Sequence, residues 1–407
     1  MLCKKTYTNL CKSKITTIFA LLHLKITDMK KRSFIFGTAV GDYNFIGREE
    51  ETRRLMNNFV EGVNTIIISP RRIGKTSLVK KVMRKLEQNK DVIVVFLDMF
   101  ACKTEYEFYN ALSAAVLKQT ASHAEKWMEN AKEFVIRLSP KIKFSPEANT
   151  DFSLSLGITP KTHTPEQVLD LAESIAKKRK KRIVVCIDEF QQVGEFSDSL
   201  TVQKRLRTAW QHQQLTSYCL FGSKKHMMNK IFQRRNMPFY QFGDTLFLGK
   251  IPEDLWVDYI MQHFEERNRH ISRQMCQQIC DTVESHSSYV QQLAWQLFSR
   301  LDEGETATDE LLKLSINDLL DSNEALFIQQ TESLSPYQFN LLRAVASGYH
   351  SGFGEKSIRE GFDLGSPSNI IRLKTTLLSK DLIESRDRGL IYFTDPVLEL
   401  WMRSRIM

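Results

Sequence analysis

A Gly-Lys-Thr triplet at residues 74–76 is the strongest chemical signal in the chain. It follows an apolar, β-branched run at 64–68 and opens a helix-forming stretch. Backbone N–H groups at such a junction point into one concavity at a helix N-terminus, where the helix dipole also favours an anion. The spacing predicts a phosphate-binding loop over 69–76. One departure is present, because Ser69 stands where the usual pattern has its first glycine. A plain helix N-terminus with a basic neighbour is the alternative.

The residue types of this loop indicate a nucleotide and a magnesium ion as ligands. Lys75 would reach the β- and γ-phosphates, and the Thr76 hydroxyl would bind Mg²⁺. The predicted nucleotide-contacting residues of the loop are Ser69, Pro70, Arg71, Arg72, Ile73, Gly74, Lys75, Thr76 and Ser77.

Two adjacent carboxylates, Asp188 and Glu189, follow an apolar run at 182–187. Parallel α/β sheets place ligands at the carboxyl ends of their strands. In a nucleotide site Asp188 would hold Mg²⁺ through water, and Glu189 would polarise the attacking water. A strand that ends in a capped turn is the alternative. Asp98 ends another apolar run at 92–97 and ranks second as a metal carboxylate.

Short apolar runs alternate with helical patterns over the first part of the chain, which predicts a parallel sheet covered on both faces. The expected strands are 64–68, 91–97, 182–187, 216–221 and 245–248, and the helical patterns include 105–119 and 165–178. The region 121–163 lacks clear periodicity and is expected to be an insertion outside the sheet.

The character of the sequence changes after Pro252. Helical runs at 253–266, 273–283 and 289–301 predict a small α-helical unit that extends to about residue 332. Helices at 336–347, 355–362 and 367–379 then precede two short strands within 382–393, around a turn at 386–389. Three helices and a hairpin describe a winged helix-turn-helix. The predicted fold is therefore α/β, a phosphate-loop NTPase with a parallel sheet, an α-helical lid and a C-terminal winged helix-turn-helix.

These elements divide the chain into four expected regions. Residues 1–33 would be disordered or upstream of the true start, with Met29 as an alternative first residue. The ATPase core would span 34–250, the lid 251–332 and the winged helix 333–407.

Composition sets broad limits on the class of protein. A chain of 407 residues is expected to form two or three domains, and 42% hydrophobic and 26% charged residues are typical of a soluble globular protein. The net charge of +9 is compatible with nucleic-acid contact but too mild to require it. The seven cysteines form no C-x-x-C pair, which favours thiols in a reduced cytoplasm. The apolar stretch 15–24 is too short to span a bilayer, so no membrane association is expected.

The phosphate-binding loop, the acidic pair and several further segments occur in an order that resembles a known family. This family is the prokaryotic ATPases of the AAA+/STAND group, often called archaeal-type ATPases. The resemblance covers about residues 34–403. The matching segments are 45–51, 70–78, 185–190, 221–228, 237–240, 288–291 and 393–396, with Leu400 and Trp401.

The resemblance implies a Mg²⁺-dependent ATPase and assigns further residues to its site. Phe45, Ile46, Gly47 and Arg48 would lie against the adenine and ribose, although Phe45 and Ile46 suit an ordinary core as well. Ser223 would sense the γ-phosphate and join Lys75 and Glu189 in catalysis, with a helix N-cap as its alternative. The helix around Tyr289 would belong to a lid that closes over the nucleotide, or Tyr289 would be lid core.

One departure from the family concerns the cation that stabilises the γ-phosphate during hydrolysis. Many relatives have an arginine shortly after the segment 237–240, where this chain has Gln241 and Phe242. Arg234 and Arg235 could substitute, or they could be a solvated helix end. Without such a cation the developing charge is less stabilised, so hydrolysis is expected to be slow. A nucleotide-gated switch is therefore favoured over a motor.

Two functions remain open for the C-terminal region. In the first, an ATP-dependent switch binds DNA. The helix at 366–379 would enter the major groove with Asn369, Arg372 and Lys374, and Arg386 and Arg388 would lie near phosphates. In the second, a STAND-like signalling scaffold docks a protein partner or a second copy of the chain, and nucleotide controls its assembly. No guanine-binding Asn-Lys-x-Asp motif occurs, which disfavours a GTPase.

Overall fold

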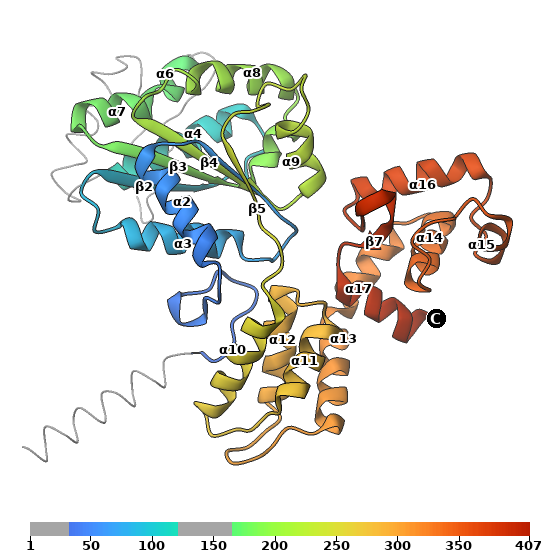
Figure 1. Cartoon of the computed structure of the whole chain (residues 1–407). Coiled ribbons are helices and arrows are strands. Elements are labelled where there is room, and N and C mark those ends of the chain that lie inside the picture. Colours follow the sequence, from blue (N-terminus) through green and yellow to red (C-terminus); the bar gives the residue numbers. More distant parts are fainter. Residues whose placement is uncertain (1–31, 121–164) are drawn as a thin grey trace, which may run out of the picture.

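The computed structural model describes residues 32–120 and 165–407 (Figure 1). The expected insertion at 121–163 and the alternative start at Met29 lie outside these residues. The same holds for the expected disordered segment 1–33, apart from its last two residues.

A five-stranded parallel sheet forms the centre of the first domain, and its strands follow the order β2-β3-β4-β1-β5. The strands are β1 (Thr65–Ile68), β2 (Val92–Asp98), β3 (Arg182–Asp188), β4 (Thr216–Gly222) and β5 (Asp244–Phe247). All four neighbouring pairs are parallel, which confirms the predicted sheet.

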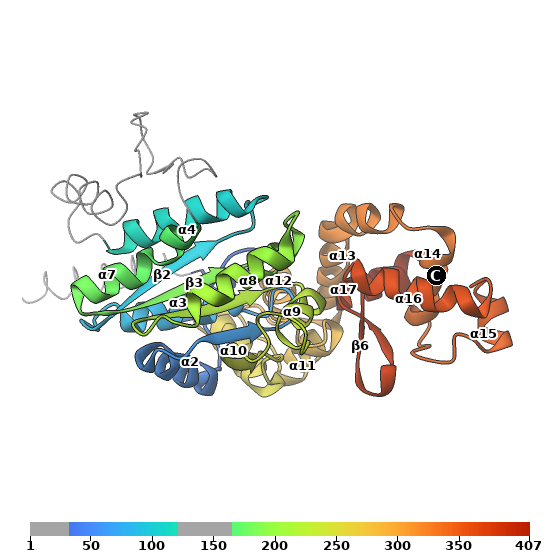
Figure 2. The ribbon, with the colours of Figure 1, turned by 90° about the horizontal axis from the view of Figure 1, so that it is seen from above.

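Helices cover both faces of this sheet, and that is why its strands are continuous apolar runs instead of alternating ones. In β1, Ile67 packs on one face, whereas Ile66 and Ile68 pack on the other. Figure 2 shows α4 and α2 on opposite sides of the sheet. The first face carries α2 (Glu49–Glu61) and α3 (Lys75–Leu86); the second carries α4 (Glu105–Thr120), α6 (Pro165–Leu169), α7 (Leu171–Arg179), α8 (Ser199–Trp210) and α9 (Lys225–Phe232).

Four helices follow the sheet and form the predicted α-helical unit below it in Figure 1. They are α10 (Glu253–Glu265), α11 (Arg273–Thr282), α12 (Ser287–Phe298) and α13 (Asp309–Glu332). Side-chain caps begin two of them, because the hydroxyls of Ser272 and Thr308 accept the backbone N–H groups of Met275 and Leu311.

The C-terminal module contains the predicted three helices and hairpin. The helices are α14 (Pro336–Ala346), α15 (Lys356–Gly361) and α16 (Pro367–Ser379), and the antiparallel strands are β6 (Ile383–Ser385) and β7 (Ile391–Phe393). The structure adds a helix that was not predicted, α17 (Pro396–Trp401), whose N-terminus is capped by Asp395. Short turns complete the fold: η1 (Asp42–Asn44), η2 (Phe190–Glu195), η3 (Asp387–Gly389) and η4 (Met402–Ile406).

One apolar cluster runs without a break from the helical unit into the C-terminal module. Phe327 of α13 and Trp401 of α17 contribute rings whose centroids are 5.8 Å apart. The two regions therefore pack as one body next to the sheet. Across the described ranges, no helix combines the length and apolarity needed to cross a membrane.

Candidate nucleotide site

The strand order brings the predicted site residues to one edge of the sheet. The phosphate-binding loop follows β1, Ser223 follows β4, and Asp188 ends β3. Because β4 lies between β1 and β3, Ser223 lies between the loop and the acidic pair. Asp98 ends β2 in register with Asp188, so the second-ranking carboxylate shares this edge.

The departure at Ser69 has a structural role in the loop. The Lys75 ammonium donates to the Ser69 hydroxyl at 3.2 Å and to the Pro70 carbonyl at 2.9 Å. Gly74 adopts a φ of 102°, which favours glycine and turns the chain into α3. Burial lowers the pKa of Lys75 to about 8, against the attraction of the Glu189 and Asp188 carboxylates.

Thr76 and Asp188 form the pair of oxygen ligands that was predicted for a metal. The Thr76 hydroxyl donates to the Asp188 carboxylate at 2.7 Å. Burial raises the pKa of Asp188 to about 6, although the hydrogen bond from Thr76 opposes this change. One hydroxyl and one carboxylate suit Mg²⁺, which usually takes its remaining ligands from phosphates and water. Within residues 32–120 and 165–407, no group of three His, Cys, Asp or Glu side chains could hold a metal.

The Glu189 carboxylate is held by two neutral donors. The Ser223 hydroxyl donates to it at 3.0 Å, and the Gln191 side-chain amide donates to the same oxygen. Ser223 is not the N-cap of α9, because Lys224 occupies that position. Gln191 was not predicted, and its place depends on Gly222, because a Cβ at Gly222 would lie 1.8 Å from the Gln191 side-chain oxygen.

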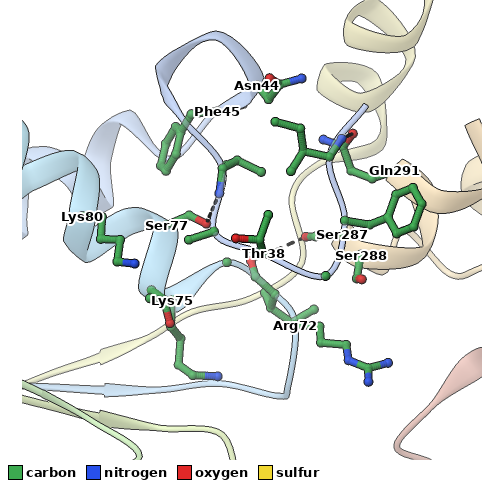
Figure 3. A pocket seen from close by; sticks show the side chains of 18 of the residues that line it. Thr38, Asn44, Phe45, Arg72, Lys75, Ser77, Lys80, Ser287, Ser288 and Gln291 are labelled. Atoms are coloured by element: carbon green, nitrogen blue, oxygen red, sulfur yellow. Dashed lines mark hydrogen bonds between the residues drawn. The ribbon is translucent and has the colours of Figure 1, made fainter. Parts of the chain in front are cut away.

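A cavity of about 590 Å³ joins these groups to the helical unit, and we call it the nucleotide cavity (Figure 3). This volume is within the range of small-ligand sites. Of the loop residues, Arg72, Ile73, Gly74, Lys75, Thr76 and Ser77 line it, together with Asp188, Glu189 and Ser223. Ser69, Pro70 and Arg71 do not line the cavity. Ser69 and Pro70 instead accept hydrogen bonds from the Lys75 ammonium.

Only some of the residues predicted to contact the adenine and ribose line the nucleotide cavity. Phe45, Ile46 and Arg48 line the nucleotide cavity, whereas Gly47 does not. Gly47 has a φ of 57°, and a Cβ there would lie 2.9 Å from Leu255, so this position needs glycine for backbone reasons. Arg48 is buried and donates to the carbonyls of Ile73 and Gly249, which ties the loop to the start of the helical unit.

Sequence patterns did not reveal the segment 35–40, which forms one wall of the nucleotide cavity. The backbone N–H of Val40 donates to the Ser77 hydroxyl at 3.1 Å, and the N–H of Ile35 donates to the Gln291 side chain at 3.1 Å. These contacts involve backbone groups that any residue type supplies, so the sequence carries no signal for them. Helix α12 adds Ser287, Ser288, Gln291 and Gln292 to the wall.

Tyr289 lies on α12 but faces away from the nucleotide cavity. It is buried, and its hydroxyl donates to the Asp395 carboxylate at 2.6 Å. The Arg72 guanidinium in turn donates to the Tyr289 hydroxyl at 3.4 Å. Tyr289 thus connects the phosphate-binding loop to the C-terminal module, a role that was not predicted.

Neither Arg234 nor Arg235 lines the nucleotide cavity, and both side chains are exposed. Gln241 is exposed as well, and Phe242 is buried against Trp210 and Phe239. Of the two residues that follow the segment 237–240, one is therefore a surface residue and the other an aromatic core residue.

Most of the predicted DNA-facing side chains of the C-terminal module contact other groups of that module. Lys374 lies over the Phe353 ring at 4.8 Å, and Asn369 donates to the Leu364 carbonyl. Arg386 bonds to Glu384 and stacks on a tyrosine ring. Arg372 and Arg388 remain exposed at the surface.

Taken together, the parallel sheet, the loop with its buried lysine and the carboxylates at the strand ends define a P-loop ATPase. Residues 45–233 match a protein family described as the ATPase domain predominantly from Archaea. These residues therefore form an archaeal-type ATPase domain. No curated protein matches its sequence.

Two solved structures share the fold across most of the chain. A Walker-type ATPase of Pyrococcus abyssi is 16% identical, with a TM-score of 0.68, and the match covers 91% of this chain and 100% of that one. The ORC2 protein of Aeropyrum pernix, in ADPNP and ADP complexes, is 14% identical, with a TM-score of 0.57 and coverage of 92% and 98%. At these identities the likeness establishes the fold.

Proposed function

We propose that the chain is an ATP-hydrolysing switch in which the bound nucleotide controls the docking of the C-terminal module. One contact carries this proposal: the guanidinium of Arg71, at the tip of the phosphate-binding loop, lies 3.5 Å from the carboxylate of Asp381. Asp381 directly precedes the hairpin of the module. A change in the conformation of the phosphate-binding loop would therefore act directly on the C-terminal module through this ion pair.

A second ion pair supports the same docking arrangement. The Lys225 ammonium, at the start of α9, lies 3.4 Å from the Glu384 carboxylate on β6. Helix α9 follows Ser223, which bonds the Glu189 carboxylate. Both contacts thus connect the reaction centre to one side of the hairpin. Arg71 is adjacent to Arg72, which lines the nucleotide cavity, so phosphates bound there would act on the loop from which Arg71 reaches Asp381.

Within the nucleotide cavity we assign the roles that the sequence suggested. Glu189 accepts a proton from the attacking water, Lys75 holds the β- and γ-phosphates, and Ser223 orients Glu189 or the γ-phosphate. Thr76 and Asp188 would hold Mg²⁺, which supplies positive charge to the phosphates. The boundaries of the core at 34–250, the lid at 251–332 and the winged helix at 333–407 remain predictions, as does a cytoplasmic location.

Carbodiimide cross-linking tests the switch, because this reagent joins an amine to a carboxylate that it already contacts. The Lys225–Glu384 cross-link should form without nucleotide and should decrease when a non-hydrolysable ATP analogue and Mg²⁺ are added. The Lys177–Glu173 pair, at 3.3 Å and with both residues in α7, is the control that nucleotide should leave unchanged. Equal Lys225–Glu384 yields with and without the analogue would rule out nucleotide control of docking.

We further propose that DNA is the partner of residues 333–407. The guanidiniums of Arg372 and Arg388 support this, since both side chains are exposed and the Arg372 guanidinium donates to Asn369, which would face DNA beside it. DNA retention by the full chain should fall steeply with salt, and Arg372→Gln with Arg388→Gln should lower the salt slope by about 2. Retention that is insensitive to salt and to these changes would contradict DNA binding.

A protein partner is the second candidate, and one observation favours it. Ile371, in the middle of the exposed face of α16, is 72% exposed, which is unusual for a helix that would read a polar groove. Absence of DNA retention, combined with oligomerisation that requires ATP in light scattering, would support this second function.

A further inference from the structure

Arg72 borders three cavities around the phosphate-binding loop. It lines the nucleotide cavity, a junction cavity of about 240 Å³ against the C-terminal module, and a carboxylate cavity next to Glu189 and Ser223. Arg71 lines the second and third but not the first. Arg72 has a φ of 58°, and its exposed side chain points away from Lys75 in Figure 3.

The C-terminal module holds Arg72 through a single bridging hydroxyl. The Arg72 guanidinium donates to the Tyr289 hydroxyl at 3.4 Å, and that hydroxyl donates to Asp395 at 2.6 Å. The other Asp395 oxygen accepts the N–H groups of Val397 and Leu398 and caps α17. The Asp395 carboxylate therefore holds both the Tyr289 hydroxyl and the N-terminus of α17.

Hydrolysis needs positive charge near the γ-phosphate, and neither Arg234 nor Arg235 lines the nucleotide cavity. Transfer of the γ-phosphoryl group spreads negative charge over its oxygens and the bridging oxygen of the leaving ADP. Of the cationic side chains that line the nucleotide cavity, Lys75 is buried in the loop and Lys80 and Arg48 lie on its helical walls. Arg72 has an exposed side chain and borders both this cavity and the carboxylate cavity next to Glu189.

We propose that Arg72 is the cation that stabilises the transition state of ATP hydrolysis, and that Tyr289 and Asp395 restrain it while the C-terminal module is docked. This inference rests on the proposed function. In the reaction, the water oxygen bonds to the γ-phosphorus as the bond to the β–γ bridging oxygen breaks. Glu189 takes the proton of the water, and the electron pair remains on ADP. Arg72 neutralises charge on the transferring group and on that leaving oxygen.

Three variants test the proposal in the full chain. Arg72→Gln should lower kcat by about 10²–10³-fold, the size of effect expected when one charge-stabilising donor is removed, with little change in nucleotide Kd. Tyr289→Phe deletes only the restraining hydroxyl and should raise kcat by about 2- to 10-fold, the equivalent of one hydrogen bond. In the double variant the rise should be absent, because no guanidinium is left to release.

The outcomes are distinct from those of the proposed function. Parental turnover in Arg72→Gln, unchanged or lower turnover in Tyr289→Phe, or a rise that persists in the double variant would overturn the role of Arg72. These results would leave the cross-link between Lys225 and Glu384 as an independent test of nucleotide-controlled docking. Arg53→Ala, an exposed arginine on α2 paired with Glu50, is the control and should match the parent.

Discussion

Replacing Lys75 with methionine should abolish ATP binding and yet raise the melting temperature of the protein measured without nucleotide. Lys75 is 5% exposed, and its ammonium has two neutral partners in the loop, the Ser69 hydroxyl and the Pro70 carbonyl. Methionine has a similar length and volume and no charge, so it fits the same space. The stability of the variant without nucleotide thus reports the free energy of burying the Lys75 charge. Its loss of ATP binding reports what that charge contributes to phosphate binding.

The size of the effect follows from the pKa of Lys75. Burial lowers this pKa from 10.5 to about 8. At pH 7 the difference corresponds to about 3 kcal/mol that opposes folding of the charged form. Loss of the two hydrogen bonds costs about 1 kcal/mol each, the average net contribution of a protein hydrogen bond. We therefore expect a net stabilisation of about 1–2 kcal/mol, which raises the melting temperature of a chain of 407 residues by about 1–2 °C.

The sign of the pH dependence provides an independent check. The penalty is complete below the folded pKa of about 8 and disappears above the unfolded value of 10.5, because both states are then neutral. At pH 9.5 it falls to about 1.4 kcal/mol. The advantage of the methionine variant should therefore be largest near pH 7 and nearly absent at pH 9.5. Differential scanning fluorimetry at both pH values measures this difference.

A Lys75→Met protein that melts below the parent at pH 7, by an amount that pH does not change, would refute the reasoning. Such a result would mean that the ammonium stabilises the loop through its contacts. Lys85→Met is the matched control, since it removes an exposed lysine from the same helix. It should shift stability by no more than about 0.5 kcal/mol.

Three further predictions concern the reaction centre. Glu189→Gln should bind ATP as the parent does and lose at least about 10²-fold in kcat, because the proton acceptor for water is gone; weaker binding with normal turnover in a coupled assay would contradict this role. Burial raises the pKa of Asp188 to about 6, so this carboxylate becomes protonated as pH falls from 7.5 to 5. Mg²⁺-dependent ADP binding should therefore weaken over this range. Titration calorimetry should show that Asp188→Asn abolishes this pH dependence. Ser223→Ala should lower kcat by about 10-fold and leave the ATP Kd within about 2-fold, since one hydrogen bond to the Glu189 carboxylate is lost; an unchanged kcat would assign Ser223 to structure alone.

The elements that carry the site were predictable because each rests on local chemistry. A β-branched run, Gly74 with its left-handed φ and the amphipathic helix that follows specify the loop within a dozen residues. The hairpin between β6 and β7 was predicted from its turn for the same reason. Helix α17 was missed because it is only six residues long and depends on its Asp395 cap and on packing against α13.

Other parts of the site could not be predicted, since they depend on residues far apart in the sequence. Gln191 reaches Glu189 because Gly222, on the neighbouring strand, leaves space for it. The segment 35–40 lines the nucleotide cavity through backbone groups that have no sequence signature.

The sequence by itself determined the strands, the phosphate-binding loop and the acidic pair, since neighbours in the chain suffice to specify them. It left the partners of the two loop arginines undetermined. Only the tertiary structure decided that Arg71 meets Asp381 and that Arg72 meets Tyr289, because these contacts join groups more than two hundred residues apart. The physical reason is that an exposed arginine can pair with any acceptor within reach, and folding decides which acceptors lie within reach. Here those acceptors belong to α12 and the C-terminal module.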